Sequence, residues 1–196
     1  MILSDHGINE ALDRGELEID PRPTDEQYQT SAVDLFIGDS FRCWDHEKLR
    51  LKGLTPILNL SEHNFLVTAH AYLIPMKLES DGSFLFPPYE DTRMHVLGIT
   101  RERIHLKKDS RLAARVEGKS GLARIGLTVH LTAPTIHAGW NGPITLEMIN
   151  YGPFTLKMIP NKTRLCQVIF ERLESVPKKE MSSQFLGQTD PSGGKH

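Results

Sequence analysis

A series of short apolar or alternating runs constrains the fold of this chain more than any other feature of its sequence. Turn-forming residues separate many of these runs, for example Gly82, Pro87-Pro88, Gly139 and Gly152-Pro153. Many short strands at such spacing are typical of a β-barrel or sandwich rather than of alternating strands and long helices. The runs in which we expect strands are Val33–Ile37, Ile57–Leu60, Phe65–Thr68, Tyr72–Pro75, His95–Ile99, Thr128–Leu131, Ile144–Ile149, Phe154–Ile159 and Leu165–Leu173.

The N-terminus predicts one short helix, over about residues 4–15. Ser4 is suited to the N-cap, and Gly15 can end the helix in a left-handed conformation. One face of the helix is apolar, made of Ile8, Ala11 and Leu12. An extended linker, Asp20-Pro21-Arg22-Pro23, should follow because proline disfavours helical backbone before it.

The length of 196 residues fits a single domain, 1–196, that is long enough to bury a proper core. The polar tail, about residues 177–196, ends in Pro191-Ser192-Gly193-Gly194-Lys195-His196 and should be mobile when nothing is bound. The formal net charge is −2 and no basic block stands out, which argues against binding to polymeric nucleic acid.

The same reading disfavours a membrane or secreted protein. No apolar run reaches the length of a membrane span, and the start, Met1–His6, lacks the regions of a signal peptide. Cys43 and Cys166 are far apart, so they indicate neither a disulfide framework nor a redox pair. We expect a reduced, cytoplasmic protein in which both cysteines are small core residues.

Familiar metal and nucleophile motifs are missing. A zinc deaminase needs an H-x-E motif together with P-C-x-x-C, and two isolated cysteines cannot form that site. The chain contains no H-E-x-x-H, no G-x-x-x-x-G-K-[ST] and no G-x-S-x-G. We therefore expect no catalytic zinc and no metal held by protein side chains.

Two segments carry residues suited to chemistry. Glu117–Leu127 begins with glycines, a hydroxyl and Lys119, a combination that can bind an anion, although a tight turn before a strand also explains it. Thr132–Glu147 predicts a turn followed by a strand, and this strand places Glu147 among apolar neighbours. One face of this strand holds Ile144, Leu146 and Met148, and the other holds Thr145, Glu147 and Ile149. The alternative is that Glu147 is an ordinary outward-facing charge on a half-exposed strand and that Trp140 serves only packing.

Taken together, the two segments resemble the dCTP deaminase family. Lys119–Leu127 is similar to the motif R-S-S-L-A-R-x-G-L, and Thr132–Glu147 is similar to T-A-x-x-I-D-x-G-W-x-G-x-I-x-L-E. The resemblance extends to Met1–Arg22, Ser31–Gly38 and Gln184–Gln188, and it is loose only over residues 41–115.

This resemblance implies a mainly β fold, a distorted barrel of the dUTPase-like or β-clip type, assembled as a homotrimer with active sites between subunits. By position, Glu147 would be the general acid and base. Ser120 would help to position water and substrate, and Arg124 from a neighbouring subunit would stabilise developing charge. The implied reaction converts dCTP to dUTP and ammonia.

The resemblance also implies the substrate contacts. Lys119 would hold phosphates, aided by Mg²⁺ bound mainly to the triphosphate, and Gln188 would close the tail over them. The full set of expected substrate-binding residues is Lys119, Gly121, Ala133, His137, Trp140, Thr145, Gln167, Gln184 and Gln188.

Some residues depart from the deaminase pattern and keep two alternatives open. Ser120–Ala123 reads S-G-L-A as in dUTPases, and Arg164–Val168 is similar to the dUTPase motif R-I-A-Q-L. Both suggest a dUTP diphosphatase or a bifunctional enzyme. His137 stands where each family has Asp, which counts against diphosphatase activity and raises the second alternative, a non-catalytic nucleotide-binding protein.

Overall fold

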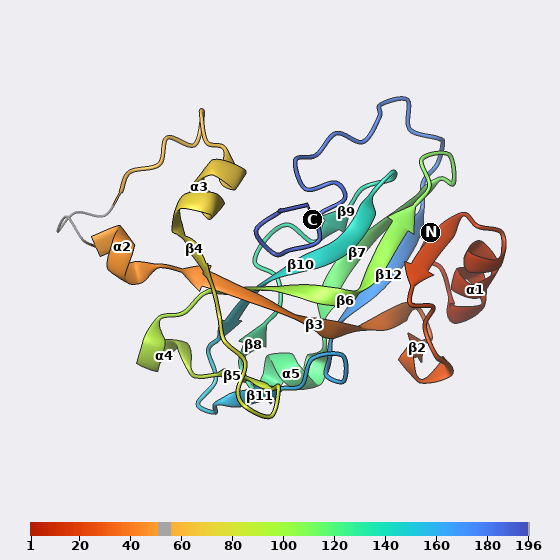
Figure 1. Cartoon of the computed structure of the whole chain (residues 1–196). Coiled ribbons are helices and arrows are strands. Elements are labelled where there is room, and N and C mark those ends of the chain that lie inside the picture. Colours follow the sequence, from red (N-terminus) through yellow and green to blue (C-terminus); the bar gives the residue numbers. More distant parts are fainter. Residues whose placement is uncertain (51–55, 196) are drawn as a thin grey trace.

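The computed structural model describes residues 1–50 and 56–195 (Figure 1). Most of the strand residues in the described chain belong to one curled sheet in the order β8-β10-β6-β3-β12-β7-β9, with β1 paired to β6 and both β2 and β4 paired to β3. β5 and β11 form a separate two-stranded sheet. The prediction of a mainly β, distorted barrel is confirmed. The strands are β1 (Leu17–Asp20), β2 (Tyr28–Gln29), β3 (Ala32–Trp44), β4 (Leu73–Pro75), β5 (Phe84–Phe86), β6 (Val96–Leu106), β7 (Leu112–Gly118), β8 (Leu127–Thr128), β9 (Thr135–Ile136), β10 (Asn141–Asn150), β11 (Leu156–Met158) and β12 (Arg164–Arg172).

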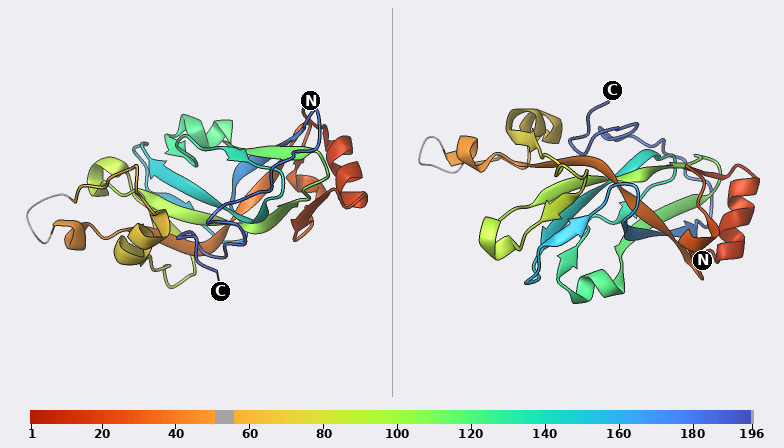
Figure 2. Two further views of the ribbon diagram at one scale, coloured as in Figure 1. Left: turned by 90° about the horizontal axis from the view of Figure 1, so that it is seen from above. Right: turned by 60° about the horizontal axis from the view of Figure 1, so that its bottom comes forward.

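Short helices lie around this sheet. Figure 2 shows α1 at one end of the sheet and both α2 and α3 at the other. The helices are α1 (Asp5–Asp13), α2 (His46–Arg50), α3 (Phe65–Tyr72), α4 (Tyr89–Thr92) and α5 (Ser120–Arg124), with one 3-10 turn, η1 (Asp25–Gln27). None of the helices in the described ranges is long and apolar enough to cross a membrane.

The N-terminal helix agrees with the sequence. The Ser4 hydroxyl accepts a hydrogen bond from the Gly7 amide at 3.2 Å, which caps α1. Gly15 has a φ of +65°, the left-handed conformation expected after a helix. Ile8 and Ala11 are fully buried against the sheet, so the apolar face of the helix is the one that packs.

Two of the predicted strands are wrong. Phe65–Thr68 lies in α3, where the Asn64 side chain accepts a hydrogen bond from the Leu66 amide and caps a helix. Ile57–Leu60 forms no strand, and Ile57 is 96% exposed. A short apolar run does not distinguish strand from helix, because the partner that would satisfy its backbone lies elsewhere in the sequence. The predicted strand at Thr128–Leu131 is also too long, since β8 ends at Thr128.

Strand β10 alternates as predicted. Leu146 and Met148 are fully buried and Ile144 nearly so, and they pack into the core on the inner face of the curl. Glu147 is half-buried on the opposite face. It pairs with Leu97 of β6, and Leu97 in turn pairs with Arg42 of β3. Directly paired residues share one face of a sheet, so these three side chains form a row across three strands.

The C-terminal segment, defined here as residues 181–194, runs back over the sheet beside α3 (Figure 1). The Gly187 amide donates a hydrogen bond to the Asn141 carbonyl at 2.8 Å, and the side chains of Gln188 and Asp190 are buried. The segment therefore has a docked arrangement over β10, whereas its mobility in the absence of ligand remains a prediction.

Candidate active site

A cavity of about 390 Å³ lies beneath the C-terminal segment. Its walls come from β10, from the loop and strand at residues 133–137, from the start of β6, from Phe65 of α3 and from the C-terminal segment itself. Segments far apart in the sequence thus enclose one space. Most of the lining is apolar or aromatic, with a few polar groups, as in typical small-molecule sites.

Glu147 is the acidic group of this cavity. Burial raises the pKa of its carboxyl above the ordinary glutamate value, although the backbone N–H of Leu131 and the nearby His130 favour the ionised form. No other carboxylate lines the cavity in the described chain. A carboxyl with a raised pKa, enclosed by apolar walls, is suited to accept and return a proton near neutral pH.

His130 connects Glu147 to a second carboxylate outside the cavity. Its Nε2 lies 3.6 Å from Oε2 of Glu117, while its Nδ1 is buried without a hydrogen-bond partner in the described structure. Glu117 in turn lies near Arg115, with 3.7 Å between its Oε1 and the arginine Nε. Glu117 and Arg115, both on β7, are thus the charged neighbours of His130.

The structure brings six of the predicted residues to the cavity: Ala133, His137, Trp140, Thr145, Glu147 and Gln188. His137 and Ala133 are exposed at its rim. Trp140 is 8% exposed, belongs to the hydrophobic core and donates from Nε1 to the Gly142 carbonyl at 2.9 Å. It therefore serves packing as well as lining the cavity.

The remaining predicted residues do not line the cavity of the same chain. Ser120, Gly121 and Arg124 are exposed on α5, which lies on the other side of the sheet from the C-terminal segment (Figures 1 and 2). The expectation that a neighbouring subunit supplies Arg124 remains a prediction, and this separation is consistent with it. Gln184 is also exposed.

Two further predicted residues bond within the sheet. The Lys119 ammonium forms an ion pair with Asp34, whose side chain is 1% exposed. The Gln167 amide donates to the Gly118 carbonyl at 3.1 Å. Both contacts place the predicted phosphate-binding turn next to β3 and β12.

Sequence reasoning missed an aromatic wall of the cavity. Trp44 lies at the end of β3, Phe65 begins α3, and Phe185 belongs to the C-terminal segment. Phe65 packs edge-on against both of the other rings, with ring centres 6.4 Å from Trp44 and 5.4 Å from Phe185. Trp44 and Phe65 fall outside the segments that carried the resemblance, so no local pattern pointed to them. Phe185 lies within Gln184–Gln188, which carried it, but the sequence alone did not single out its ring.

His95 was also missed, although it lines the cavity on the same sheet face as Glu147. Its Nδ1 lies 3.4 Å from the Trp44 indole nitrogen, which can only donate. The neutral ring therefore carries its proton on Nε2, and Nε2 is buried without a partner among the described residues. Burial lowers the pKa of His95, so the ring stays neutral at neutral pH.

Comparison with known proteins gives the family. The model of the dCTP deaminase-like family matches residues 2–173. The chain is 36% identical to a dUMP-forming dCTP deaminase of Methanosphaera stadtmanae, over 99% of this chain and 93% of that protein. It is 37% identical to a dCTP deaminase of Rhodospirillum rubrum, over 91% of this chain and 86% of that protein.

A solved structure supports the same fold. The 2'-deoxycytidine 5'-triphosphate deaminase from Agrobacterium tumefaciens superposes with a TM-score of 0.61 at 18% identity, over 87% of this chain. This chain spans 48% of that one. The curled sheet, the cavity built around Glu147 and the family match over residues 2–173 lead to one conclusion: the chain belongs to the dCTP deaminase-like family.

Proposed function

We propose that this protein deaminates dCTP to dUTP and ammonia, with Glu147 as general acid and base. The observation that carries the proposal is a single half-buried carboxyl with a raised pKa in a largely apolar cavity. The names of the two relatives, both dCTP deaminases, support the same substrate.

The deamination requires one protein group that transfers protons to and from the cytosine ring. Glu147 would take one proton from the water that attacks C4 of the cytosine and deliver it to N3. It would then take the second proton, from the new hydroxyl at C4, and deliver it to the amino group, which leaves as ammonia while the C4 carbonyl forms. General acid–base catalysis of this kind contributes roughly 10²–10⁴-fold, so the enclosed cavity must supply the rest by orientation and electrostatics.

The triphosphate needs cations that the cavity does not contain. No lysine or arginine lines it within the described chain. We propose that a neighbouring copy in a homotrimer presents Arg124 and Lys119 to this cavity, since both lie on or beside α5, away from the Glu147 of their own chain.

We also propose that Mg²⁺ enters with the nucleotide and that no zinc takes part. In the described ranges, no group of three or more His, Cys, Asp or Glu side chains could hold a metal. Mg²⁺ is typically bound by substrate phosphates with few protein ligands. Turnover should therefore persist when a zinc-selective chelator is added with Mg²⁺ in excess, and a loss of turnover restored by zinc would defeat this part of the proposal.

A dUMP-forming reaction is the second candidate, and the name of the Methanosphaera relative favours it. Hydrolysis of the triphosphate needs a second water-activating base. His137, at the rim, stands where the resembling families have Asp, and Glu147 is the sole carboxylate of the described cavity. These residues favour dUTP as the released product.

The test incubates the purified protein with Mg²⁺ and dCTP, and separately with dUTP, and measures ammonia, pyrophosphate and both nucleotides. We expect ammonia and dUTP in equal amounts from dCTP, and no pyrophosphate from dUTP. Glu147→Gln should abolish ammonia release while nucleotide binding remains. Pyrophosphate and dUMP would establish the second candidate, and full turnover by Glu147→Gln would refute the assigned role.

A further inference from the structure

The C-terminal segment closes the cavity through two buried polar side chains. Gln188 is 3% exposed, and its amide nitrogen donates to the Thr145 hydroxyl and to the Pro143 carbonyl, each at 3.0 Å. Thr145 is two residues before Glu147 on the same face of β10. Gln188 therefore attaches the segment directly beside Glu147.

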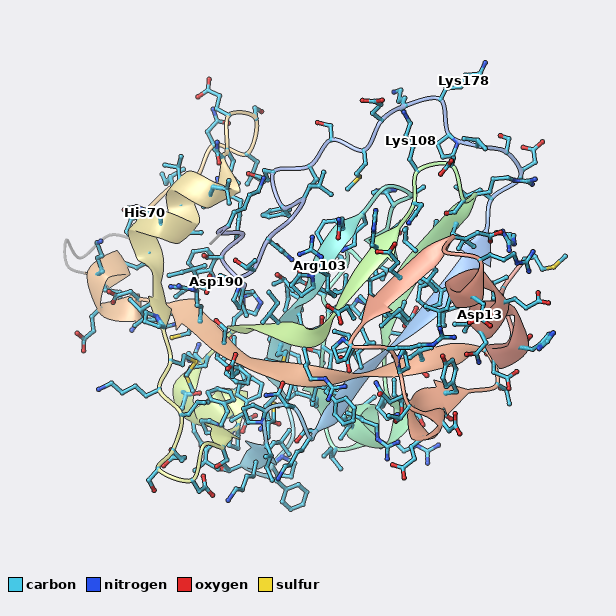
Figure 3. All side chains as sticks on the ribbon, turned by 45° about the vertical axis from the view of Figure 1, so that its right-hand side comes forward. Asp13, His70, Arg103, Lys108, Lys178 and Asp190 are labelled. Carbon is cyan, nitrogen blue, oxygen red and sulfur yellow. The ribbon has the colours of Figure 1, made fainter. Side chains whose placement is uncertain are left out.

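Asp190 makes the second attachment, to strand β3. Its Oδ1 accepts a hydrogen bond from Arg42 Nε at 2.6 Å, and its Oδ2 accepts one from the Ser40 hydroxyl at 3.1 Å. The Ser192 amide also donates to Oδ1, at 2.9 Å. Asp190, labelled in Figure 3, thus has both carboxylate oxygens bonded although its side chain is only 10% exposed.

The ion pair is held in its charged form. Burial raises the pKa of the Asp190 carboxyl, but hydrogen bonds from Arg42 and Ser192 outweigh burial, and the pKa lies below the ordinary aspartate value. A buried carboxylate that loses its cation is left uncompensated, which is strongly unfavourable. Loss of Arg42 or of the Asp190 charge should therefore release the segment rather than leave it docked with an unpaired charge.

The two attachments lie at opposite ends of the row formed by Glu147, Leu97 and Arg42. Arg42 pairs with Leu97, and Leu97 pairs with Glu147, so all three share one sheet face. The C-terminal segment thus crosses from β10 to β3 above β6. In this position it supplies Phe185 and Gln188 to the cavity lining, and Phe185 also packs on Phe65.

We propose that Asp190 is a positioning residue for the site: its ion pair with Arg42 holds the C-terminal segment in place, so that Gln188 and Phe185 close the cavity over Glu147. This inference rests on the proposed function, because it assigns the ion pair to the cavity in which dCTP would bind. It adds a role for two residues, Arg42 and Asp190, that do not themselves line that cavity.

The test compares Asp190→Asn with Glu180→Gln, a matched loss of one charge. Glu180 precedes the C-terminal segment and pairs with Lys108 on the surface, its side chain 82% exposed. Amide hydrogen exchange over residues 183–195, melting temperature, and kcat and KM for dCTP are measured for both variants and the wild type. For Asp190→Asn we expect faster exchange in these residues and a KM raised on the order of tenfold or more, because hydrogen bonds to a charged group are lost. Glu180→Gln should match the wild type.

A double-mutant cycle identifies the partner. Arg42→Gln alone should raise KM as Asp190→Asn does, and combining the two should add little, because either change already breaks the pair. If Asp190→Asn lowers the melting temperature of the whole chain, hydrogen exchange, kcat and KM are measured for Arg42→Lys instead. This variant changes the partner on β3: it keeps the positive charge but loses the hydrogen bond from Nε.

Unchanged exchange over residues 183–195 in Asp190→Asn would overturn the proposal, as would a KM equal to that of Glu180→Gln. The exchange measurement needs no turnover. If the wild type released no ammonia from dCTP, the proposed function would fail, while the exchange rates would still decide whether the ion pair holds the segment.

Discussion

At the scale of single residues, Glu147 combines its proposed chemical role with a cost in stability. Its carboxyl is half-buried and its pKa is raised by that burial. A carboxyl whose pKa is higher in the folded than in the unfolded protein opposes folding once it is ionised. The cavity thus holds a carboxyl whose charge is disfavoured by burial, a common trade between stability and activity.

Glu147→Gln should therefore raise the melting temperature at neutral pH while abolishing turnover. The gain should vanish below about pH 4, where the carboxyl is protonated in both states, and grow as the pH rises through the pKa of the folded protein. Each kcal/mol gained corresponds to roughly 2–4 °C for a chain of this size. Melting curves of both proteins between about pH 4 and pH 8 provide the measurement, and an equal difference at every pH would contradict the burial argument.

At the scale of elements, β10 ends in a turn that ties the small two-stranded sheet to the large one. Asn150 is fully buried, and its amide nitrogen donates to the Phe86 carbonyl at 2.9 Å and to the Phe154 carbonyl at 2.8 Å. Its oxygen accepts from the Gly152 amide at 3.1 Å. Gly152 itself tolerates no side chain, because a Cβ would lie 1.8 Å from the Ile125 carbonyl oxygen.

Asn150→Ala should destabilise the protein by about 2–4 kcal/mol, since it leaves two buried carbonyls and one amide without partners. Asn59→Ala, in an exposed loop, serves as the control and should change stability by less than about 0.5 kcal/mol. Urea unfolding of the two variants and the wild type measures the difference. A loss no greater than that of the control would show that this turn does not join the two sheets.

At the scale of the whole molecule, the residues of the expected chemistry do not meet in one cavity of the same described chain. Glu147 lies under the C-terminal segment, whereas Arg124 is exposed on α5 and makes no ion pair in the described structure. A cyclic trimer can bring the α5 of one copy to the cavity of the next, since the same interface repeats around the axis.

Complementation between inactive variants tests this arrangement. Glu147→Gln and Arg124→Ala should each be inactive alone. An equal mixture of the two variants, refolded together, should recover about a quarter of wild-type activity, because each interface in the mixture draws its two chains independently. Ammonia release after refolding is the readout, with each variant refolded alone as the control. No recovery from a mixture shown to contain mixed trimers would argue that each chain builds its own site.

Much of the fold and part of the site follow from local sequence. Alternation along β10 predicts that Glu147 faces away from the core, and capping residues predict α1 between Ser4 and Gly15. These features depend on side-chain periodicity and backbone preference, which neighbouring residues determine. The run Phe65–Thr68 shows the limit of such arguments, because apolar residues alone leave helix and strand equally open.

Local sequence accounts for most of the strand pattern, for the first helix and for the acidic residue of the cavity. Long-range contacts place His95 and Trp44 in the same cavity as Glu147, pair Lys119 with Asp34 and dock the C-terminal segment over the cavity. The physical reason is that strand register and long-range ion pairs join residues far apart in the chain. Local periodicity does not specify which distant strand will pair with a given strand, or which distant charge will pair with a given side chain.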